Sequence, residues 1–212
     1  MKIDILTLFP KMFKGPFDES MLLKAILKKA VEIEIHDLRN WGEGERKTVD
    51  DRPYSGGPGM LLRVDIIDAA LKDLRKKNAK VVLLDAGGEK FTQQKAIQLS
   101  KLDHIILICG HYEGVDHRVH EHLVDEVISV GDYVLTGGEI PAMIVTDAIT
   151  RLLPGVLEKA GAKEIESHST PGYKEYPQYT RPEVYKKWSV PKVLLSGNHK
   201  EIEKWRKEKT KF

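Results

Sequence analysis

The sequence predicts an α/β fold with a mostly parallel sheet, and three observations lead to this class. Short apolar segments alternate with longer segments of helical periodicity, as expected when strands and helices alternate along a chain. Two of the apolar segments, Lys80–Leu84 and His104–Cys109, consist mainly of apolar side chains, which is typical of strands covered on both faces. Glycine-rich turns follow these strands and precede helices.

Each expected element follows from its own pattern of apolar residues. Strands are expected where apolar or β-branched residues alternate or form an unbroken run, at residues 2–8, 31–36, 80–84, 104–109 and 126–130. Helices are expected where apolar residues recur on one face, at residues 19–29, 64–74, 92–99 and 117–123. Residues 40–59 are rich in glycine and charge and predict a long loop, which inside a compact domain is usually functional or disordered.

The segment Ser129–Arg151 combines several features of a binding site. Its first part, SVGDYVL, has a strand-like apolar pattern that Gly137 and Gly138 interrupt. A helix is expected next, with Pro141 in its first turn, where the missing N–H has no intrahelical partner. A glycine turn at the end of a strand lets a ligand approach the bare backbone closely.

A change in composition predicts a domain boundary near residue 160. Residues 1–158 form the expected main domain, and residues 159–178 lack a clean period and predict a linker. Residues 179–212, which include YTRPEVYKKW and the amphipathic segment Ile202–Lys209, predict a short, mainly helical appendage.

The bulk composition is that of an ordinary globular protein. Of 212 residues, 41% are hydrophobic and 31% are charged, and the formal net charge is +2. No segment has the pattern of a membrane span or a signal peptide. The single cysteine, Cys109, excludes an internal disulfide and favours a cytoplasmic location.

Three glycine turns occupy the same place relative to the strands. The sequences DAGGEK, GHYEGVD and VGDYVLTGGE each follow an apolar strand and precede a helix. Because ligands of open α/β sheets bind beyond the carboxyl ends of the strands, these turns could converge on one pocket. None of them is a phosphate-binding loop. The alternative, that they are tight connections in which glycine relieves steric crowding, remains open from the pattern alone.

Six motifs carry a resemblance to a known family. In order they are DDRPYSGGPGM, CGHYEGVD, GDYVLTGGEIPA, RLLPGVL, YTRPEV and LLSGNH. Together they resemble the bacterial tRNA (guanine-N1)-methyltransferase family, the TrmD-type enzymes of the SPOUT superfamily, from TLFPKMF near the start to IEKWR near the end. The resemblance implies methylation of N1 of guanine 37 in tRNA, a deep trefoil knot, and a homodimer whose active sites are shared between subunits.

The resemblance also implies that S-adenosylmethionine lies in a bent conformation against the three turns. Its expected contacts are Leu84, Ala86, Gly88, Gly110, Tyr112, Glu113, Gly114, Val130, Gly131, Asp132, Tyr133, Val134, Leu135, Gly137, Gly138 and Pro141. Glycines would let the main chain come within hydrogen-bonding range of the donor, and a mainly apolar cleft suits its adenine.

The catalytic roles follow from the same resemblance. Methylation of N1 requires a base that removes its proton, and a cation can stabilise the charge that develops on O6. Arg151 matches the family's arginine, although an ion pair with Asp147 is the alternative. Glu113 matches a glutamate near the donor and is otherwise a solvated turn residue. Glu166 stands where the family has an aspartate, so we expect it to be the base, with His168 as a less favoured substitute.

Other interpretations remain beside this one. Four histidines lie near Cys109 and could suggest a zinc site: His111, His117, His120 and His122. Their spacing matches no usual set of zinc ligands, so no metal site is expected. Magnesium is an assisting ion that only the resemblance suggests. The family usually continues past IEKWR, so the short lysine-rich end could hold tRNA phosphates or be a solvated helix end. A tRNA-binding relative with weak catalysis is the alternative function.

Overall fold

The computed structural model describes residues 1–54, 56–157 and 165–211. It divides into two compact units, Met1–Glu158 and Lys159–Phe212, which we describe separately. The bounds of the expected linker, 159–178, and of the appendage, 179–212, remain predictions.

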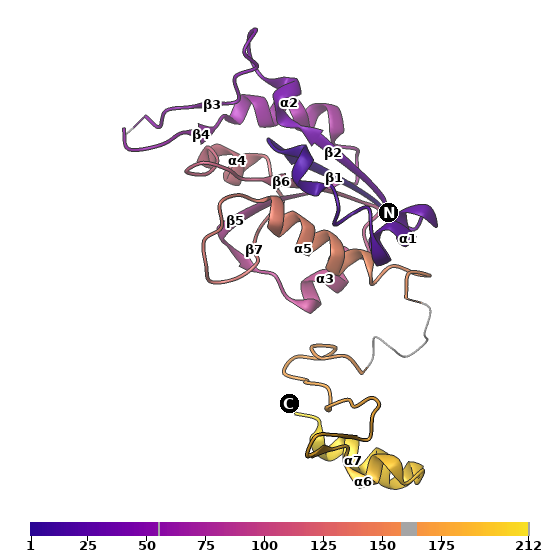
Figure 1. Cartoon of the computed structure of the whole chain (residues 1–212). Helices are drawn as coiled ribbons and strands as arrows, with labels where there is room; N and C mark the ends of the chain where they lie inside the picture. Colours follow the sequence, from indigo (N-terminus) through magenta and orange to yellow (C-terminus); the bar gives the residue numbers. More distant parts are fainter. Residues whose placement is uncertain (55, 158–164, 212) are drawn as a thin grey trace. The chain divides into compact units, whose positions relative to one another are not determined.

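A five-stranded sheet forms the centre of the first unit (Figure 1), and every pairing within it is parallel. Its strands lie in the order β2-β1-β6-β5-β7 and are β1 (Lys2–Thr7), β2 (Glu32–Asp37), β5 (Lys80–Lys90), β6 (His104–Cys109) and β7 (Glu126–Ser129). All six residues of β6 are buried, because strands of a parallel sheet are covered on both faces. The prediction of an α/β fold with a mostly parallel sheet is confirmed.

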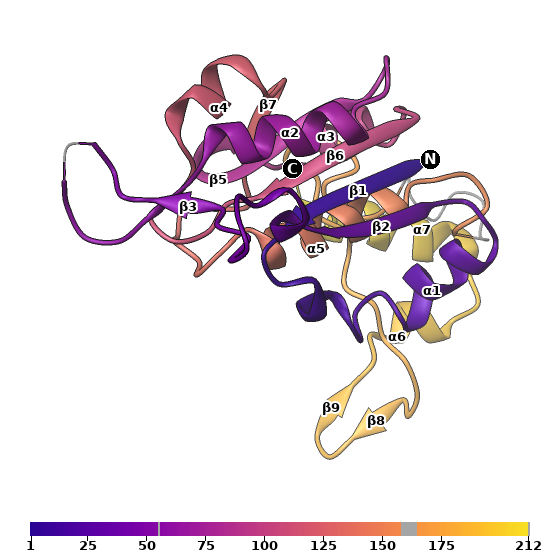
Figure 2. The ribbon, with the colours of Figure 1, turned by 90° about the horizontal axis from the view of Figure 1, so that it is seen from above.

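Helices cover both faces of this sheet, as Figure 2 shows for α1 and α5 on one side and α2 and α4 on the other. The first face packs against α1 (Ser20–Leu27), α3 (Gln93–Leu99) and α5 (Glu139–Thr150). The second packs against η2 (Leu38–Trp41), α2 (Val64–Leu74) and α4 (His117–His122). Side chains alternate between the two clusters, so that Ile5 joins the first and Leu6 the second.

Most of the expected elements occur within a few residues of their predicted bounds. In α1 the predicted buried face is confirmed by Leu22 and Ala25. The long loop after η2 is largely irregular and contains a two-stranded pair formed by β3 (Asp50–Asp51) and β4 (Leu61–Leu62). The short 3-10 helix η1 (Pro10–Phe13) follows β1.

Two predictions in the first unit were wrong. The segment DAGGEK was expected to be a turn, but β5 continues through it to Lys90 after a register shift between Leu84 and Glu89. Pairing with Ile128 and Ser129 of β7 keeps this glycine-rich segment extended. The segment SVGDYVL was expected to be a strand, but β7 ends at Ser129 and residues 130–138 are irregular.

The second unit contains α6 (Lys192–Leu195), α7 (His199–Lys209) and a short hairpin. The hairpin strands β8 (Val184–Tyr185) and β9 (Trp188–Ser189) were not among the expected elements. Lys186 has a φ of 56° at the turn, and its ammonium lies over the rings of Tyr185 and Trp188. Along residues 1–54, 56–157 and 165–211, every helix falls short of the length and apolar character that crossing a lipid bilayer requires.

Candidate functional site

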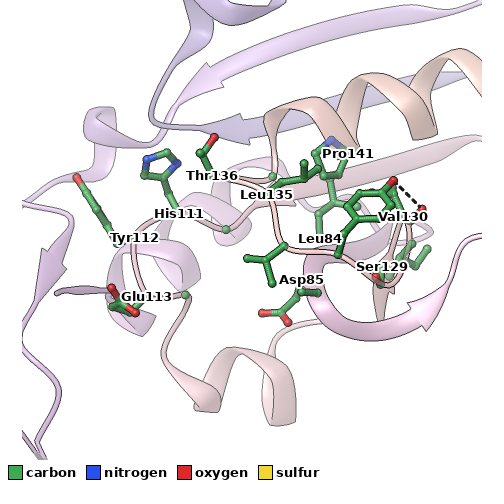
Figure 3. A pocket seen from close by; sticks show the side chains of 18 residues that line it. Leu84, Asp85, His111, Tyr112, Glu113, Ser129, Val130, Leu135, Thr136 and Pro141 are labelled. Carbon is green, nitrogen blue, oxygen red and sulfur yellow. Dashed lines mark hydrogen bonds between the residues drawn. The ribbon is translucent and has the colours of Figure 1, made fainter. Parts of the chain in front are cut away.

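A pocket of about 200 Å³ lies at the carboxyl ends of β6 and β7 and beside the middle of β5 (Figure 3). Three segments line it, and they are the three glycine-rich segments that the sequence singled out, the first of which lies within β5. The lining residues are Leu84, Asp85, Ala86, Gly110, His111, Tyr112, Glu113, Gly114, Ile128, Ser129, Val130, Tyr133, Val134, Leu135, Thr136, Gly137, Gly138 and Pro141. The convergence of the turns on one pocket is therefore what the structure has.

Close backbone contact joins two of these segments. The N–H of Gly138 donates to the carbonyl of Gly110 at 2.8 Å, and His111 and Gly137 form an antiparallel bridge. A β-carbon on Gly138 would lie 2.6 Å from the Cα of Cys109. Only glycine permits this approach, which brings the start of α5 against the end of β6.

The strand β4 holds the second segment in place. The N–H of Leu62 donates to the carbonyl of Gly114, and the N–H of Asp116 donates to the carbonyl of Leu62, each at 3.0 Å. The N–H of Glu113 donates to the carbonyl of Met60 at 3.1 Å. The glycine-rich loop before β4 thus supports the turn that carries Glu113, and its backbone contacts hold this turn in place beside the pocket.

The third segment folds back on itself between β7 and α5. The ring of Tyr133 covers Gly131, where a β-carbon would lie 2.3 Å from Cε1, and its hydroxyl donates to the carbonyl of Val130 at 3.3 Å. Asp132 pairs with Lys90 at 2.5 Å and is not among the lining residues. Val134 is 85% exposed, so its apolar side chain is available to a ligand.

Polar groups surround the pocket on two sides. Asp85 accepts a hydrogen bond from the N–H of Gly87 at 2.8 Å, and its Oδ2 lies 3.5 Å from Nε2 of His120. Glu139, in the first turn of α5, is buried and accepts a hydrogen bond from the Thr7 hydroxyl at 2.7 Å. Burial raises the pKa of the Cys109 thiol, and the negative charge of Glu139 raises it further.

Of the expected donor contacts, all but Gly88, Gly131 and Asp132 line the pocket. Gly88 lies against the backbone of β7, where a β-carbon would be 2.6 Å from the nitrogen of Ile128. The prediction omitted several lining residues because it followed the family positions and not every residue of each turn: Asp85, His111, Ile128, Ser129 and Thr136. Asp85, His111 and Thr136 lie in the three glycine-rich segments, which was the available signal, whereas Ile128 and Ser129 belong to β7.

The two other expected catalytic residues, Arg151 and Glu166, are not among the residues that line the pocket. Arg151 directly follows α5 and is half-buried, about 15 Å along the helix from Pro141 at 1.5 Å per residue. Its N–H donates to the carbonyl of Asp147, and the alternative of a side-chain ion pair between them remains a prediction. Glu166 belongs to the second unit, in a turn where the N–H of Ser169 donates to its carbonyl and His168 has a φ of 69°.

Among the described residues, the histidines near Cys109 do not form a set of zinc ligands. The rings of His117 and His120 stack at 5.1 Å, yet they face different carboxylates, Glu121 and Asp85. A different group has donor atoms within 4.8 Å of one another, and the prediction of no metal site did not anticipate it: Asp4, Glu34 and His36.

That group lies on β1 and β2, and its residues are not among those that line the pocket. The ammonium of Lys2 lies 2.8 Å from Glu34 and 3.2 Å from Asp4, so the group already contains a cation. Burial raises the pKa of Asp4, but hydrogen bonds with His36 and His104, both at 2.6 Å, and with Lys2 outweigh it and lower the pKa overall. We therefore interpret it as an ion-pair network around the buried carboxylate of Asp4.

Comparison with known proteins adds to this geometry. The family model described as tRNA (Guanine-1)-methyltransferase TrmD matches residues 1–212. A protein of Bacillus subtilis (strain 168) is 50% identical over 213 residues, which cover 99% of this chain and 87% of that protein. Proteins of Dehalococcoides mccartyi (strain ATCC BAA-2100 / JCM 16839 / KCTC 5957 / BAV1) and Dictyoglomus turgidum (strain DSM 6724 / Z-1310) are 48% and 50% identical, covering 99% and 98% of the chain and 86% and 84% of the relatives. All three are named tRNA (guanine-N(1)-)-methyltransferase.

Proposed function

Because the chain belongs to the tRNA (guanine-1)-methyltransferase TrmD family, we propose that its strand-end pocket binds S-adenosylmethionine for methylation of N1 of guanine 37 in tRNA. Membership of the family makes the chain a methyltransferase that acts on guanine in tRNA. The observation that carries the proposal is the convergence of three glycine turns on one pocket. Its lining combines apolar side chains with backbone N–H and C=O groups, which suits an adenosine with a charged tail.

The donor supplies an electrophilic methyl group on a sulfonium when it is bound. In the proposed step, N1 of guanine forms a bond to the methyl carbon as the sulfur–carbon bond breaks. The electron pair of the broken bond stays on sulfur, so that the sulfonium becomes a neutral thioether. The N1 proton passes to the carboxylate of Glu166, which acts as general base. Arg151 stabilises the negative charge that develops on O6. Glu113, on the turn held by β4, lies at the edge of the pocket and is proposed to position the reacting groups.

We further propose that each active site is shared within a homodimer. Pro141 lines the pocket, whereas Arg151 lies about 15 Å further along α5, so one chain separates the two. A twofold dimer would bring the Arg151 end of one α5 to the pocket of its partner. In addition, none of the described residues after Val156 is buried, and several large apolar side chains are exposed: Ile165, Tyr179, Val184, Tyr185, Trp188 and Leu195. These would be covered by a partner subunit or by tRNA.

Mixing two inactive variants tests the sharing of the site. Arg151→Ala and Glu166→Gln are each expected to lack activity as homodimers. If Arg151 and Glu166 of one site come from different subunits, half of the dimers in an equal mixture are mixed and each has one intact site. Activity should then recover to about a quarter of the wild-type value. If a mixture that is shown to contain mixed dimers stays inactive, the proposal of an active site shared between subunits is contradicted.

The alternative is a tRNA-binding relative with weak catalysis, favoured by the glutamate at the position of the family's aspartate. Incubation with methyl-labelled donor and tRNA transcripts carrying guanine or adenine at position 37 distinguishes the two. We expect label only in the guanine transcript, and binding without transfer would favour the alternative. The same assay with and without EDTA tests the magnesium that the family resemblance suggests.

Two further features of the family are proposed for this chain. The first is the trefoil knot, which the match to the family model supports. The second is a cytoplasmic location, where tRNA is modified and where a buried free thiol such as Cys109 stays reduced.

A further inference from the structure

We infer that the pocket contains a carboxylate subsite, formed by His111 and supported by Glu139 and Thr7, that binds the α-carboxylate of the methyl donor. The inference rests on the proposed function, because it assigns one group of the proposed donor to one residue of the pocket. It concerns a residue that the expected donor contacts did not include. It also gives a role to Glu139, a buried carboxylate that the proposed mechanism does not use.

Glu139 is the first observation that requires an explanation. Its side chain is 2% exposed at the start of α5, and a charge buried to this degree is costly unless it is compensated. Oε1 accepts the hydrogen bond from Thr7, and the N-terminal end of α5 offers a partial positive charge. Oε2 lies 3.7 Å from Nδ1 of His111. The buried carboxylate of Glu139 therefore faces the imidazole of His111.

His111 is held so that one edge faces Glu139 and the ring borders the pocket. Nδ1 is buried and has no hydrogen-bond partner, while the side chain as a whole is 20% exposed. The rings of Phe9 and Tyr112 pack against the imidazole, with centroids 4.7 and 5.1 Å away. A β-carbon on Gly137 would lie 2.5 Å from Nδ1, so the close fit of the ring against the loop depends on glycine there.

The charges around the pocket indicate which part of the donor His111 would meet. The described residues that line it include two carboxylates, Asp85 and Glu113, but neither lysine nor arginine. S-adenosylmethionine carries a sulfonium, an ammonium and one carboxylate, so the first two groups suit the acidic residues. His111 is the lining side chain that can carry a positive charge, and an ionised hydrogen bond to a carboxylate is among the stronger kinds.

The arrangement in Figure 3 agrees with this assignment. His111 and Glu113 project from one side of the pocket, whereas Leu84, Val130 and Pro141 lie together on the other. Adenine is expected at the apolar side, which directs the amino-acid end of the donor toward His111. The guanidinium of Arg39 lies over the ring of Phe9, 5.8 Å from its centroid.

A comparison of two ligands tests the subsite without relying on activity. S-adenosylhomocysteine and the same thioether without its carboxylate are titrated into the full-length protein by calorimetry. Wild type should prefer the carboxylated ligand by roughly 10-fold to 100-fold, the range for a hydrogen bond to a charged group. His111→Gln should abolish this preference, and Glu139→Gln should lower it several-fold. His111→Arg, which keeps a cation, should retain the preference.

The control and the contradicting results are equally specific. His117→Gln removes an imidazole that also faces a carboxylate but is 77% exposed on α4, and it should leave the preference unchanged. An equal loss of affinity for both ligands in His111→Gln would show a purely structural role and overturn the subsite. Weaker tRNA binding with an unchanged ligand preference would overturn it in favour of an RNA phosphate. If wild type binds neither ligand, the proposed function itself fails; if it binds both equally, only the subsite fails. Because Glu139→Gln could fail to fold, His111→Gln is the deciding variant.

Discussion

Replacement of Gly138 by alanine tests whether close backbone contact shapes the pocket. The added methyl group would lie 2.6 Å from the Cα of Cys109 and 2.8 Å from the nitrogen of Gly110. Backbone atoms cannot rotate away, so the two segments must separate by about 0.8 Å to reach ordinary contact distance. This separation would also stretch the hydrogen bond from Gly138 to Gly110.

Both rate and stability should respond to this change. A displacement of about 1 Å near reacting groups can lower a rate on the order of 100-fold, and overpacking typically costs about 1–3 kcal/mol. We therefore expect methylation of tRNA to slow by roughly 100-fold and Tm to fall by roughly 2–4 °C for each kcal/mol lost.

A matched control separates the pocket from general instability. In Gly44→Ala the methyl group meets no atom within 4 Å, but the φ of 68° is strained for alanine and costs about 1–2 kcal/mol. This variant should lose stability while keeping affinity for S-adenosylhomocysteine. If Gly138→Ala had the same stability and methylation rate as wild type, the idea that this backbone contact shapes the pocket would be refuted.

Three further predictions concern the catalytic residues and the buried network. Glu166→Gln should abolish methylation while calorimetry still detects donor binding, and full activity would remove Glu166 from the mechanism. Arg151→Ala should lower kcat by about 10²- to 10³-fold, as loss of one charge-stabilising group does, whereas Arg151→Lys should lose less. For Asp4, whose folded pKa lies below its ordinary value, the pairing stabilises the fold above pH of about 4 and is lost as the pH falls further. At pH 7 the free energy of unfolding of Asp4→Asn, measured with urea, should therefore be about 3–5 kcal/mol lower than that of wild type. The difference should be smaller at pH 3, and an equal difference at both pH values would contradict this.

The parts of the fold that could be predicted are those where the local pattern and the tertiary environment agree. The strand His104–Cys109 is apolar throughout and lies at the centre of the sheet, so composition and burial give the same answer. The face of α1 with Leu22 and Ala25 follows from helical spacing alone. The glycine turns also indicated the pocket, because in a parallel sheet the carboxyl ends of neighbouring strands meet at one edge.

The wrong predictions have separate physical causes. In β5, pairing with β7 outweighs the glycines of DAGGEK, and such long-range pairing leaves no local signal. In residues 130–138, apolar side chains such as Val134 line a pocket, and a short apolar run cannot show whether it is covered by protein or by a ligand. The hairpin of β8 and β9 was not expected from the sequence, because its turn uses Lys186 with a positive φ, where the usual signal would be glycine or asparagine.

The most direct measurement of the central claim is a crystal structure of the protein with S-adenosylhomocysteine. We predict density for the bent ligand in the strand-end pocket, with its adenine beside Leu84 and Pro141 and its carboxylate beside His111. Glu166 of the partner subunit should approach Arg151 at the same site. Ligand density outside this pocket, or a pocket that stays empty at saturating ligand concentration, would contradict the assignment of the donor site.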